Sequence, residues 1–455
     1  MNVTRKKIKV GVVGLGSFGN DFMALFVGHP DIGEVVLCDR IEDRIAATKA
    51  AHGLTRSYTD YDEMLKQKDI DCVAIFTQRH LHAPMVLKAL EAGKHVYSAV
   101  PIACSIEEIR QIIEKVKETR LVYMMGETCY YFPCAIYCRE KYKLGHFGKF
   151  VYGESQYYHD ISHMAPDFQR TGGDRWQRVA GIPPMFYPTH SIAMLFASIN
   201  EHATKVSCMG YRDNNADNIY GEGKNNWDNP FSNETAIFQM SGGGVARINE
   251  FRRVGTNQPS SYITCLYGED GAYERSVTQH TFQRKATEHE EAYVEYLDDM
   301  MNPVIYLDDK KHWNPYRVET VEDLYTLKHF EKTASGIPWH RAPISPRYTT
   351  REAPMQDLSR LPKYFRAFHW GHQYSHPFLI DDFVRAVVDE KLPPNNAWDS
   401  ARFMIPGLIA HESALRGGEL LDIPDFGDAP ADWERLTFEP KDYYEEGPEN
   451  AKKPF

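Results

Sequence analysis

VGVVGLGSFG, residues 10–19, joins an apolar run to three glycines with the spacing G-x-G-x-x-G. The run predicts a buried strand, and the amphipathic segment 18–27 predicts a helix directly after it. In this context Gly14 permits a tight turn, Gly16 lets the backbone approach a pyrophosphate, and Gly19 lets the helix pack on the strand. The positive end of the helix dipole attracts the anion. This stretch therefore predicts a dinucleotide site.

A second apolar run, VVLCD at residues 35–39, ends in an acidic side chain. A carboxylate at the end of this strand accepts hydrogen bonds from a ribose and repels a 2′-phosphate, which favours NAD over NADP. The neighbouring Arg40 can accommodate such a phosphate, so NADP stays the second choice. The dinucleotide contacts predicted from these two stretches are Gly14, Gly16, Ser17, Phe18, Gly19, Asp39 and Arg40.

The composition predicts a globular protein with a small-molecule ligand. A chain of 455 residues with 42% hydrophobic content can form two or three domains with sizeable cores. Its formal net charge of −11 disfavours binding to nucleic acid or to an anionic membrane. The charged N-terminus lacks a signal-peptide apolar region, and the eight cysteines are scattered, which suits free thiols in a reducing compartment. We therefore expect a cytoplasmic protein.

Two patterns of hydrophobic residues divide the chain into two parts. Strands and helices alternate up to about residue 126, which predicts a doubly wound parallel sheet. From residue 150 the apolar runs become longer, more aromatic and alternating, which predicts a large, mostly antiparallel open sheet with one exposed face. The predicted strands of this second part are 150–158, 205–211, 235–240, 245–251 and 262–267, and its later helices are 378–389 and 397–415.

These patterns predict an α/β fold with an N-terminal Rossmann domain at 1–126 and a C-terminal α+β domain at 127–424. Residues 425–455 form an irregular acidic tail. Within the second domain, residues 280–364 show little periodicity, and the segment is too long for an ordinary connection. We consider three interpretations of it: a lid, an oligomer arm or a mobile insertion. Because an open apolar sheet face favours pairing, we expect a homo-oligomer.

Three further stretches follow the glycine motif in order: TQRHLHAP at 77–84, EAGKHV at 91–96 and GEDG at 268–271. Together they resemble the glucose-fructose oxidoreductase, inositol dehydrogenase and MocA superfamily over most of residues 8–275 and again over 370–423. The resemblance implies NAD or NADP in the first domain and a sugar or cyclitol in the second. It also implies further cofactor contacts, which are Thr77, Arg79, His82 and Glu127.

One motif departs from the superfamily. Its members usually carry Glu-Lys-Pro after the strand at 95–97, with the lysine as a catalytic group, whereas this chain reads Ala99-Val100-Pro101. Valine can neither transfer a proton nor polarise a hydroxyl group. Either the dehydrogenase activity is lost, or another residue performs the proton transfer that accompanies hydride removal from an alcohol.

MFYPTH, residues 185–190, supplies a candidate. It resembles the Tyr-Pro-Thr-His signature of the NAD-dependent α-N-acetylgalactosaminidases, glycoside hydrolase family 109, a branch of the same superfamily. The stretches MMGETCY at 124–130, YHD at 158–160 and GH at 371–372 also resemble this branch and occur in the expected order.

We expect His190 and Tyr187 to be the catalytic pair. Pro188 fits a first helical position, which predicts a helix up to Asn200 with Tyr187 and His190 one turn apart on one side. The positive helix end favours a neutral imidazole that is available as a base. A purely structural histidine is the alternative, and the vacant lysine role favours catalysis.

Polar and aromatic side chains elsewhere suit a sugar ring. A guanidinium fork beside an indole ring, at 175 and 176, combines hydrogen bonding with stacking, although a surface anchor is an equal alternative. Tyr158, His159, Asp160 and His163 have metal-ligand types, but strand alternation separates them, so we predict no metal. The predicted substrate contacts are Tyr158, His159, Asp160, Arg175, Trp176 and His372.

The leading hypothesis is an NAD-dependent enzyme that oxidises a ring hydroxyl of a sugar or glycoside, with carbon 3 expected. Elimination, hydration and return of the hydride could follow, and the protein would then be a redox-neutral glycosidase that needs no carboxylate pair across the bond. A dinucleotide sensor without catalysis is the third hypothesis. The sugar, the anomer, the end point of the reaction and the subunit number stay open.

Overall fold

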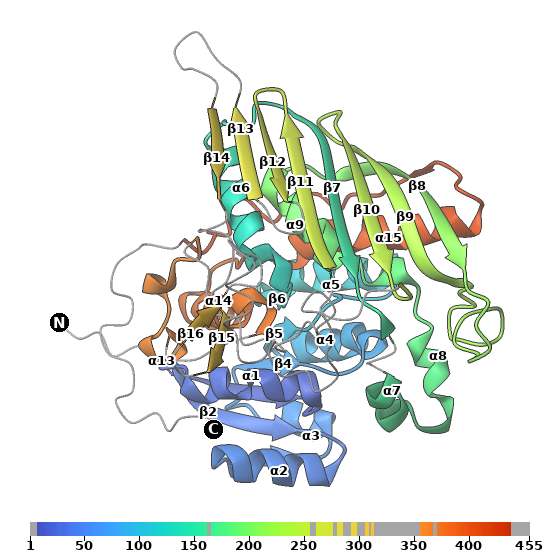
Figure 1. Cartoon of the computed structure of the whole chain (residues 1–455). Coiled ribbons are helices and arrows are strands. Elements are labelled where there is room, and N and C mark those ends of the chain that lie inside the picture. The colour runs from blue at the N-terminus through green and yellow to red at the C-terminus, as the bar shows by residue number, and fades with distance from the viewer. Residues whose placement is uncertain are drawn as a thin grey trace.

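The structure, a computed structural model, describes residues 7–161, 165–254, 261–275, 280–284, 293–297, 305–308, 311–313, 355–366 and 371–437. Figure 1 shows two sheets, the smaller in the blue N-terminal part and the larger fanned above it. The predicted combination of a Rossmann sheet and a large, mostly antiparallel sheet is confirmed.

The N-terminal sheet has six parallel strands in the order β3-β2-β1-β4-β5-β6. Its strands are β1 Ile8–Val13, β2 Ile32–Cys38, β3 Ser57–Tyr58, β4 Cys72–Ile75, β5 His95–Ser98 and β6 Tyr123–Met125. The helices between them are α1 Ser17–Gly28, α2 Glu42–His52, α3 Tyr61–Leu65, α4 His82–Glu91 and α5 Ile106–Thr119. The central strands are buried on both faces, because helices cover both sides of a parallel sheet. The carboxyl ends of these strands share one edge.

The second sheet has nine strands in the order β14-β13-β12-β11-β7-β10-β9-β8-β17. All neighbours are antiparallel except β7 and β10, which run parallel at its centre. The strands are β7 Phe150–Tyr158, β8 Ala203–Arg212, β9 Phe231–Met240, β10 Val245–Phe251, β11 Ser261–Gly268, β12 Gly271–Arg275, β13 His280–Arg284, β14 Tyr293–Tyr296 and β17 Leu421–Asp422.

Helices separate the second sheet from the N-terminal part. Helices α9 Thr189–Ile199 and α15 Ala397–Leu415 contact strands of this sheet, and α6 Pro133–Lys143 packs on α9 (Figure 1). Two short helices, α7 Ala165–Gly172 and α8 Trp176–Ala180, lie beside the N-terminal part. Exposed side chains of the outer face include Met209, Tyr211 and Ile237.

The region between 280 and 364, predicted as an insertion, is partly regular. Strands β13 and β14 extend the large sheet, β15 Ile305–Asp308 pairs with β16 Lys311–Trp313, and a short helix, α13 Lys363–Arg366, follows. Residues 314–354 lie outside the described part, as do 438–455 of the predicted tail. None of the helices in the described part of the chain combines the length and apolar character that crossing a membrane requires. All eight cysteines are free.

A buried charge cluster ties the segment before α13 to α14 Gly371–Asp389. Arg360 Nη1 donates to Asp382 Oδ1 over 2.5 Å and lies 3.6 Å from Asp381 Oδ2. Tyr131 donates to the other oxygen of Asp382, and His29 Nε2 lies 3.3 Å from Asp381 Oδ1. The cluster therefore links α1, α14 and two loops in one desolvated network.

We predict that Arg360→Met lowers the free energy of unfolding by about 3–5 kcal/mol, because it leaves two buried carboxylates without their main countercharge. Urea denaturation followed by circular dichroism checks this.

The control is Arg110→Met, which removes an exposed side chain that pairs with Glu107 and Glu114 on α5. Surface ion pairs contribute little, so its urea midpoint should stay close to that of the parent. Equal midpoints for the two variants would contradict the assignment of the Arg360 cluster as a structural anchor.

Candidate active site

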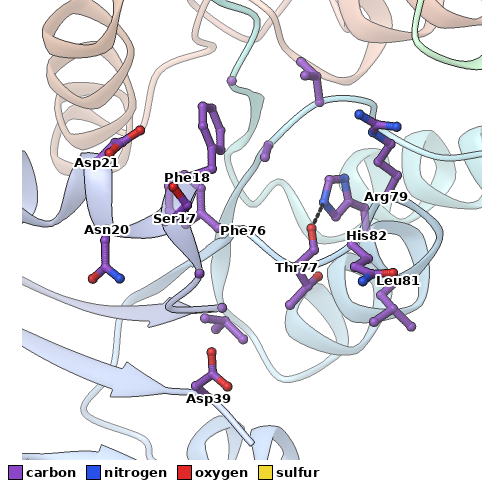
Figure 2. A pocket seen from close by; sticks show the side chains of 18 of the residues that line it. Ser17, Phe18, Asn20, Asp21, Asp39, Phe76, Thr77, Arg79, Leu81 and His82 are labelled. Carbon is purple, nitrogen blue, oxygen red and sulfur yellow. Dashed lines mark hydrogen bonds between the residues drawn. The ribbon is translucent and has the colours of Figure 1, made fainter. Parts of the chain in front are cut away.

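One cavity of about 1570 Å³ runs along the carboxyl edge of the N-terminal sheet and into the second part of the chain. It is lined by the glycine loop, by the ends of β2 and β4, and by residues that include Tyr187, His190 and His372. In Figure 2, Ser17 and Phe18 at the start of α1 lie at the upper left, Asp39 lies below them, and Arg79 and His82 lie together on the right. A single ligand of ordinary size fills roughly 300–1,000 Å³ of pocket, so this cavity has room for two.

The glycine loop fits a dinucleotide. Gly14 has a φ of +90°, and a Cβ there would lie 2.8 Å from the backbone of Phe76, so the turn requires glycine. A Cβ on Gly19 would lie 2.1 Å from Gly14 O, which shows how closely α1 packs on the turn. A Cβ on Gly16, in contrast, would meet only Arg44 Nη1 at 4.0 Å. Gly16 is the N-cap of α1 and offers no side-chain cap, so its open side leaves the first helical amides accessible to a phosphate.

Asp39 is held rigidly at the end of β2. Leu15 N donates to its Oδ2 over 2.7 Å, and Ile41 N donates to its Oδ1 over 2.9 Å. Each carboxylate oxygen keeps a second lone pair that can accept from a ribose hydroxyl. Arg44 Nη1 lies 3.7 Å from Asp39 Oδ2, and Arg40 is exposed and also lines the cavity. Asp39 can therefore accept hydrogen bonds from a ribose diol, and the nearby arginines can donate hydrogen bonds to a 2′-phosphate.

The loop after β4 reaches from the dinucleotide groove to the second part of the chain. Arg79 places its guanidinium 4.2 Å from the ring centroid of Tyr187. His82 Nδ1 lies 2.7 Å from Pro101 O and its Nε2 lies 3.0 Å from Thr77 O, so the ring ties two loops together (Figure 2). Both residues line the cavity with Thr77, and their contact with a dinucleotide stays a prediction. His82 has little left to offer a ligand, because backbone carbonyls occupy both ring nitrogens.

The family resemblance implied that Glu127 contacts the cofactor. In the structure, however, Glu127 does not line the cavity. It is fully buried behind His190, and its Oε1 accepts from His190 Nδ1 over 2.7 Å and from Cys129 N over 2.8 Å. Burial raises the pKa of this carboxyl, but the charge and hydrogen bond of His190 outweigh it and hold the pKa below its usual value. An ionised carboxylate only accepts, so Nδ1 of His190 carries a proton, and in the neutral form of the ring the lone pair is on Nε2.

His190 and Tyr187 meet at the same wall of the cavity, and their rings stand perpendicular with centroids 5.0 Å apart. Helix α9 begins at Thr189, where the sequence predicted it. Pro188 is its N-cap and not its first residue, and Tyr187 is the C-cap of a preceding short helix, Pro184–Phe186. Burial raises the pKa of Tyr187, which keeps its hydroxyl protonated. Of the two, His190 therefore has the side chain that can accept a proton, and the Tyr187 hydroxyl can donate a hydrogen bond.

Buried charges from the central strands hold the segment that carries this pair. Arg252 Nη2 lies 3.3 Å from Pro184 O and 3.4 Å from Tyr187 O, and it pairs with Glu250 at 2.7 Å. Ser191, next to His190, donates to the same Glu250. Burial raises the pKa of Glu250 to about 8, although Arg252 opposes the shift. These contacts fix both ends of the Tyr187–His190 segment.

His372 reaches the cavity from an unusual backbone. It begins a run of three left-handed residues, His372, Gln373 and Tyr374, with φ of 50°, 50° and 64°. Such a conformation costs about 1–2 kcal/mol for each residue that is not glycine. Its ring centroid lies 6.4 Å from that of His190, and its Nδ1 lies 2.8 Å from His376 Nε2. Burial, with His190 nearby, lowers the pKa of His372 to about 4, so the ring is neutral at pH 7.

Ala99 and Val100 also line the cavity, where relatives of the superfamily usually carry a lysine. Val100 is buried and offers only methyl groups. The imidazole of His190 opens onto the same cavity, so an ionisable group is present although the lysine is not.

Within the described part of the chain, Glu127, Cys129 and His190 place three potential metal-ligand atoms within 4.8 Å of one another. Tetrahedral ligands with bonds of about 2.0 Å stand about 3.3 Å apart, whereas His190 Nδ1 and Glu127 Oε1 are 2.7 Å apart. Burial raises the pKa of the Cys129 thiol well above its usual value, which keeps it protonated. The geometry is that of a hydrogen-bonded pair, and the absence of a metal stays a prediction.

Several predicted substrate contacts lie elsewhere. Tyr158 points to the opposite face of β7 and stacks on Phe251 with a centroid distance of 4.5 Å. Asp160 accepts from Val254 N over 3.4 Å, outside the cavity lining. Arg175 is exposed, and Trp176 packs against a small apolar cluster around Ile161 and Ala180 instead of lining the cavity. Only His159 and His372 of the six predicted contacts line it, and His163 lies outside the described residues.

Other residues of the site escaped the sequence reasoning. Tyr157 lines the cavity and stands perpendicular to His190 at 4.9 Å, one position before the predicted Tyr158. The buried Glu250 and Arg252 were also missed, although two opposite charges at the end of an apolar strand are a signal of a buried ion pair. Trp227, from the loop between β8 and β9, lines the cavity and had no signal in the sequence pattern.

Comparison with known proteins agrees with this geometry. Residues 8–127 match the model of an oxidoreductase family with an NAD-binding Rossmann fold. A glycosyl hydrolase family 109 protein of Streptomyces niveus is 27% identical over 59% of this chain and 58% of its own length. An α-N-acetylgalactosaminidase of Shewanella oneidensis is 28% identical over 42% of this chain and 44% of its own length. The resemblance to the superfamily and to its family 109 branch is thereby confirmed, although the chain spans less than two thirds of these relatives.

Solved structures share the whole fold. A levoglucosan dehydrogenase in complex with NADH and levoglucosan aligns over 92% of this chain and 100% of its own, with a TM-score of 0.65 and 17% identity. A myo-inositol 2-dehydrogenase of Lactobacillus plantarum aligns over the same shares, with a TM-score of 0.62 and 17% identity. At this identity the likeness establishes the fold of the described chain and not its substrate.

We predict that Gly16→Val weakens NADH binding about tenfold or more, because the added methyl groups occupy the open side from which a pyrophosphate approaches. Fluorescence titration with NADH measures the effect. The melting temperature should change little, since Gly16 has an extended backbone and its Cβ meets no close neighbour.

The matched comparison is Gly19→Ala, whose Cβ would collide with Gly14 O. This variant should melt at a lower temperature than Gly16→Val. Unchanged NADH affinity in stable Gly16→Val would place the dinucleotide somewhere other than the glycine loop.

Proposed function

We propose that this protein is an NAD-dependent enzyme that oxidises a ring hydroxyl, at carbon 3, of a sugar or glycoside. The observation that carries the proposal is the buried Glu127–His190 pair, which opens with a lone pair at Nε2 onto a cavity shared with the dinucleotide groove. Two of the similar proteins carry the names of glycosidases and two those of a sugar and an inositol dehydrogenase, which supports a carbohydrate substrate.

The chemistry follows from the residues at this wall. His190 Nε2 accepts the hydroxyl proton of the substrate, and the Glu127 carboxylate stabilises the resulting imidazolium. A nicotinamide bound in the cavity would take the hydride from the same carbon. Tyr187, whose hydroxyl stays protonated, donates a hydrogen bond to the substrate oxygen. Together the proton and hydride transfers leave a keto sugar.

A second candidate function is redox-neutral cleavage of a glycosidic bond, which the relatives of family 109 favour. Once carbon 3 is a carbonyl, the proton on carbon 2 becomes acidic and a second base can remove it, so the group at carbon 1 leaves. The neutral His372 stands on the same wall as His190 and is our candidate for this base. Addition of water and return of the hydride would complete the cycle.

NAD is our proposed cofactor over NADP, since Asp39 stands at the end of β2 with both oxygens fixed. The homo-oligomer, the cytoplasmic location and the division at residue 126 stay predictions. We expect no nucleic-acid partner, given the net charge of −11.

Incubation with NAD and a panel of 4-nitrophenyl glycosides, with NADH and nitrophenol absorbance read together, should separate the two functions. Oxidation alone yields NADH without nitrophenol, whereas the full cycle yields nitrophenol without stoichiometric NADH. The panel includes α- and β-anomers of glucose, galactose and N-acetylgalactosamine. NADH binding without either product on any sugar would favour the dinucleotide sensor.

We predict that His190→Ala lowers kcat by about 10²–10⁴-fold, because the proton acceptor is lost. Glu127→Gln should lower kcat by about 10²-fold or more, because an amide no longer stabilises the imidazolium. The dissociation constant for NADH should stay unchanged in both variants, since neither side chain lies in the glycine loop.

The double variant distinguishes a role through His190 from a general structural role. Residues that act as one unit are not additive, so Glu127→Gln should cost nothing further in the His190→Ala background. Additive losses would show that Glu127 acts independently of the imidazole.

A further inference from the structure

The second part of the chain contributes more to the cavity than proton transfer requires. Besides the tyrosine and histidine side chains already described, it adds five residues that are mostly aromatic or apolar, and two of them come from α7. They are Phe168, Arg170, Val179, Ile182 and Trp227. Polar groups that suit sugar hydroxyls, such as those of His159 and Tyr187, line the same cavity. The cavity therefore has aromatic and apolar lining in addition to the groups that proton transfer requires.

Trp227 lies in a loop that is held by several side-chain-to-backbone hydrogen bonds. The loop between β8 and β9 has the sequence DNNADNIYGEGKNNWDNP at residues 213–230. Asn225 is buried in it, and its Oδ1 accepts from Trp227 N over 3.1 Å and from Asn229 N over 2.9 Å. Its Nδ2 donates to Ile219 O over 3.0 Å and to Asn229 O over 2.9 Å. One amide thus holds four backbone groups around Trp227.

Asn229 fastens the same loop to the wall of the site. Its Nδ2 donates to Gly181 O over 3.2 Å and to Phe231 O over 2.8 Å, and its Oδ1 accepts from Phe231 N over 2.8 Å. Asn226 N donates to Arg178 O over 3.0 Å, which ties the loop to α8. A Cβ on Gly181 would lie 2.3 Å from Ile219 O, so the two segments pack backbone to backbone.

This anchoring reduces the conformational entropy that Trp227 would lose when a ligand binds. A half-buried indole on a mobile loop would lose conformational entropy whenever it bound a ligand, whereas a fixed indole has already lost it. Fixed aromatic faces stack on planar rings and on the apolar faces of sugar rings. The hydrogen bonds of Asn225 and Asn229 run almost wholly to main-chain atoms, so they set the position of Trp227 and leave its ring available to the cavity.

We propose that Trp227, with Phe168, Val179 and Ile182, forms a subsite for a planar or apolar ring attached to the reacting sugar. The inference rests on the proposed function, since His190 marks where that sugar sits. The substrate class is then a glycoside with an aryl or second-ring aglycone, and not a free monosaccharide. Asn225 is a positioning residue for the subsite.

The test compares paired 4-nitrophenyl and methyl glycosides of glucose, galactose and N-acetylgalactosamine. Their dissociation constants are measured by calorimetry on the full-length protein saturated with NADH, which blocks oxidation, and turnover is measured separately with NAD. The parent should bind at least one 4-nitrophenyl glycoside about tenfold more tightly than its methyl partner. Trp227→Ala should abolish that preference, and Trp227→Phe should retain most of it.

Two further variants keep the proposal falsifiable. Asn225→Ala should lower the aryl preference without lowering turnover of the methyl glycoside, because the loop loses its anchor and not its indole. Tyr211→Ala removes an exposed aromatic ring on β8 that does not line the cavity, and the preference should stay intact.

The outcomes separate the subsite from the proposed function. Loss of aryl preference in Trp227→Ala supports the subsite even where the parent turns over no glycoside, in which case the proposed function fails alone. Turnover by the parent with equal binding of aryl and methyl glycosides overturns the subsite and leaves the function standing. A parent that binds no member of any pair overturns the subsite as well.

Discussion

A hydrogen bond between two halves of the chain, from His190 to Glu127, is the contact on which the site depends. Glu127 follows β6 of the first sheet by two residues, and His190 lies in the first turn of α9, which packs on the second sheet. A buried carboxylate without a partner is costly, so this bond stabilises the junction and orients the imidazole at once. Asn395 Nδ2 adds a contact to Glu127 O at 3.4 Å. Packing of the two halves and orientation of the imidazole therefore depend on the same contact.

The surroundings of residue 100 help to explain why valine stands where relatives of the superfamily usually carry lysine. Arg79 already brings a positive charge to the Tyr187 ring, and an ammonium group at residue 100 would add another to the same cavity. With Val100 in place, the His190 imidazole is an ionisable group that still lines this cavity. Its carboxylate partner lies behind it, sheltered from water, where an interaction between charges is less screened.

Periodicity was enough to predict the two sheets and the approximate positions of β7 to β11, because burial on a sheet imposes regular spacing. Strand ends were less accurate, since β9 begins at Phe231 and not at residue 235. Side-chain direction was harder. Tyr157 and Tyr158 differ by one position and face opposite sides of β7, and the sequence alone did not fix which face met the cavity. Trp176 was predicted to stack on a sugar and Trp227 was not considered, although Trp227 lines the cavity and Trp176 packs in a small apolar cluster. The difference depends on how distant loops pack, which the sequence pattern does not show. Glu127 was placed near the right neighbours and given the wrong contact, because its partner lies 63 residues away.

The amides that hold the loop between β8 and β9 have a consequence for how such a protein could diversify. The side chains of Asn225 and Asn229 form hydrogen bonds with backbone atoms of the loop. The stability of the loop therefore depends little on which side chain is present at position 227. The residue at position 227 can then change during evolution without a change in the dinucleotide groove or in the rest of the fold. Paralogues with the same two asparagines and a different residue between them would form a natural series in which selectivity drifts and chemistry is inherited.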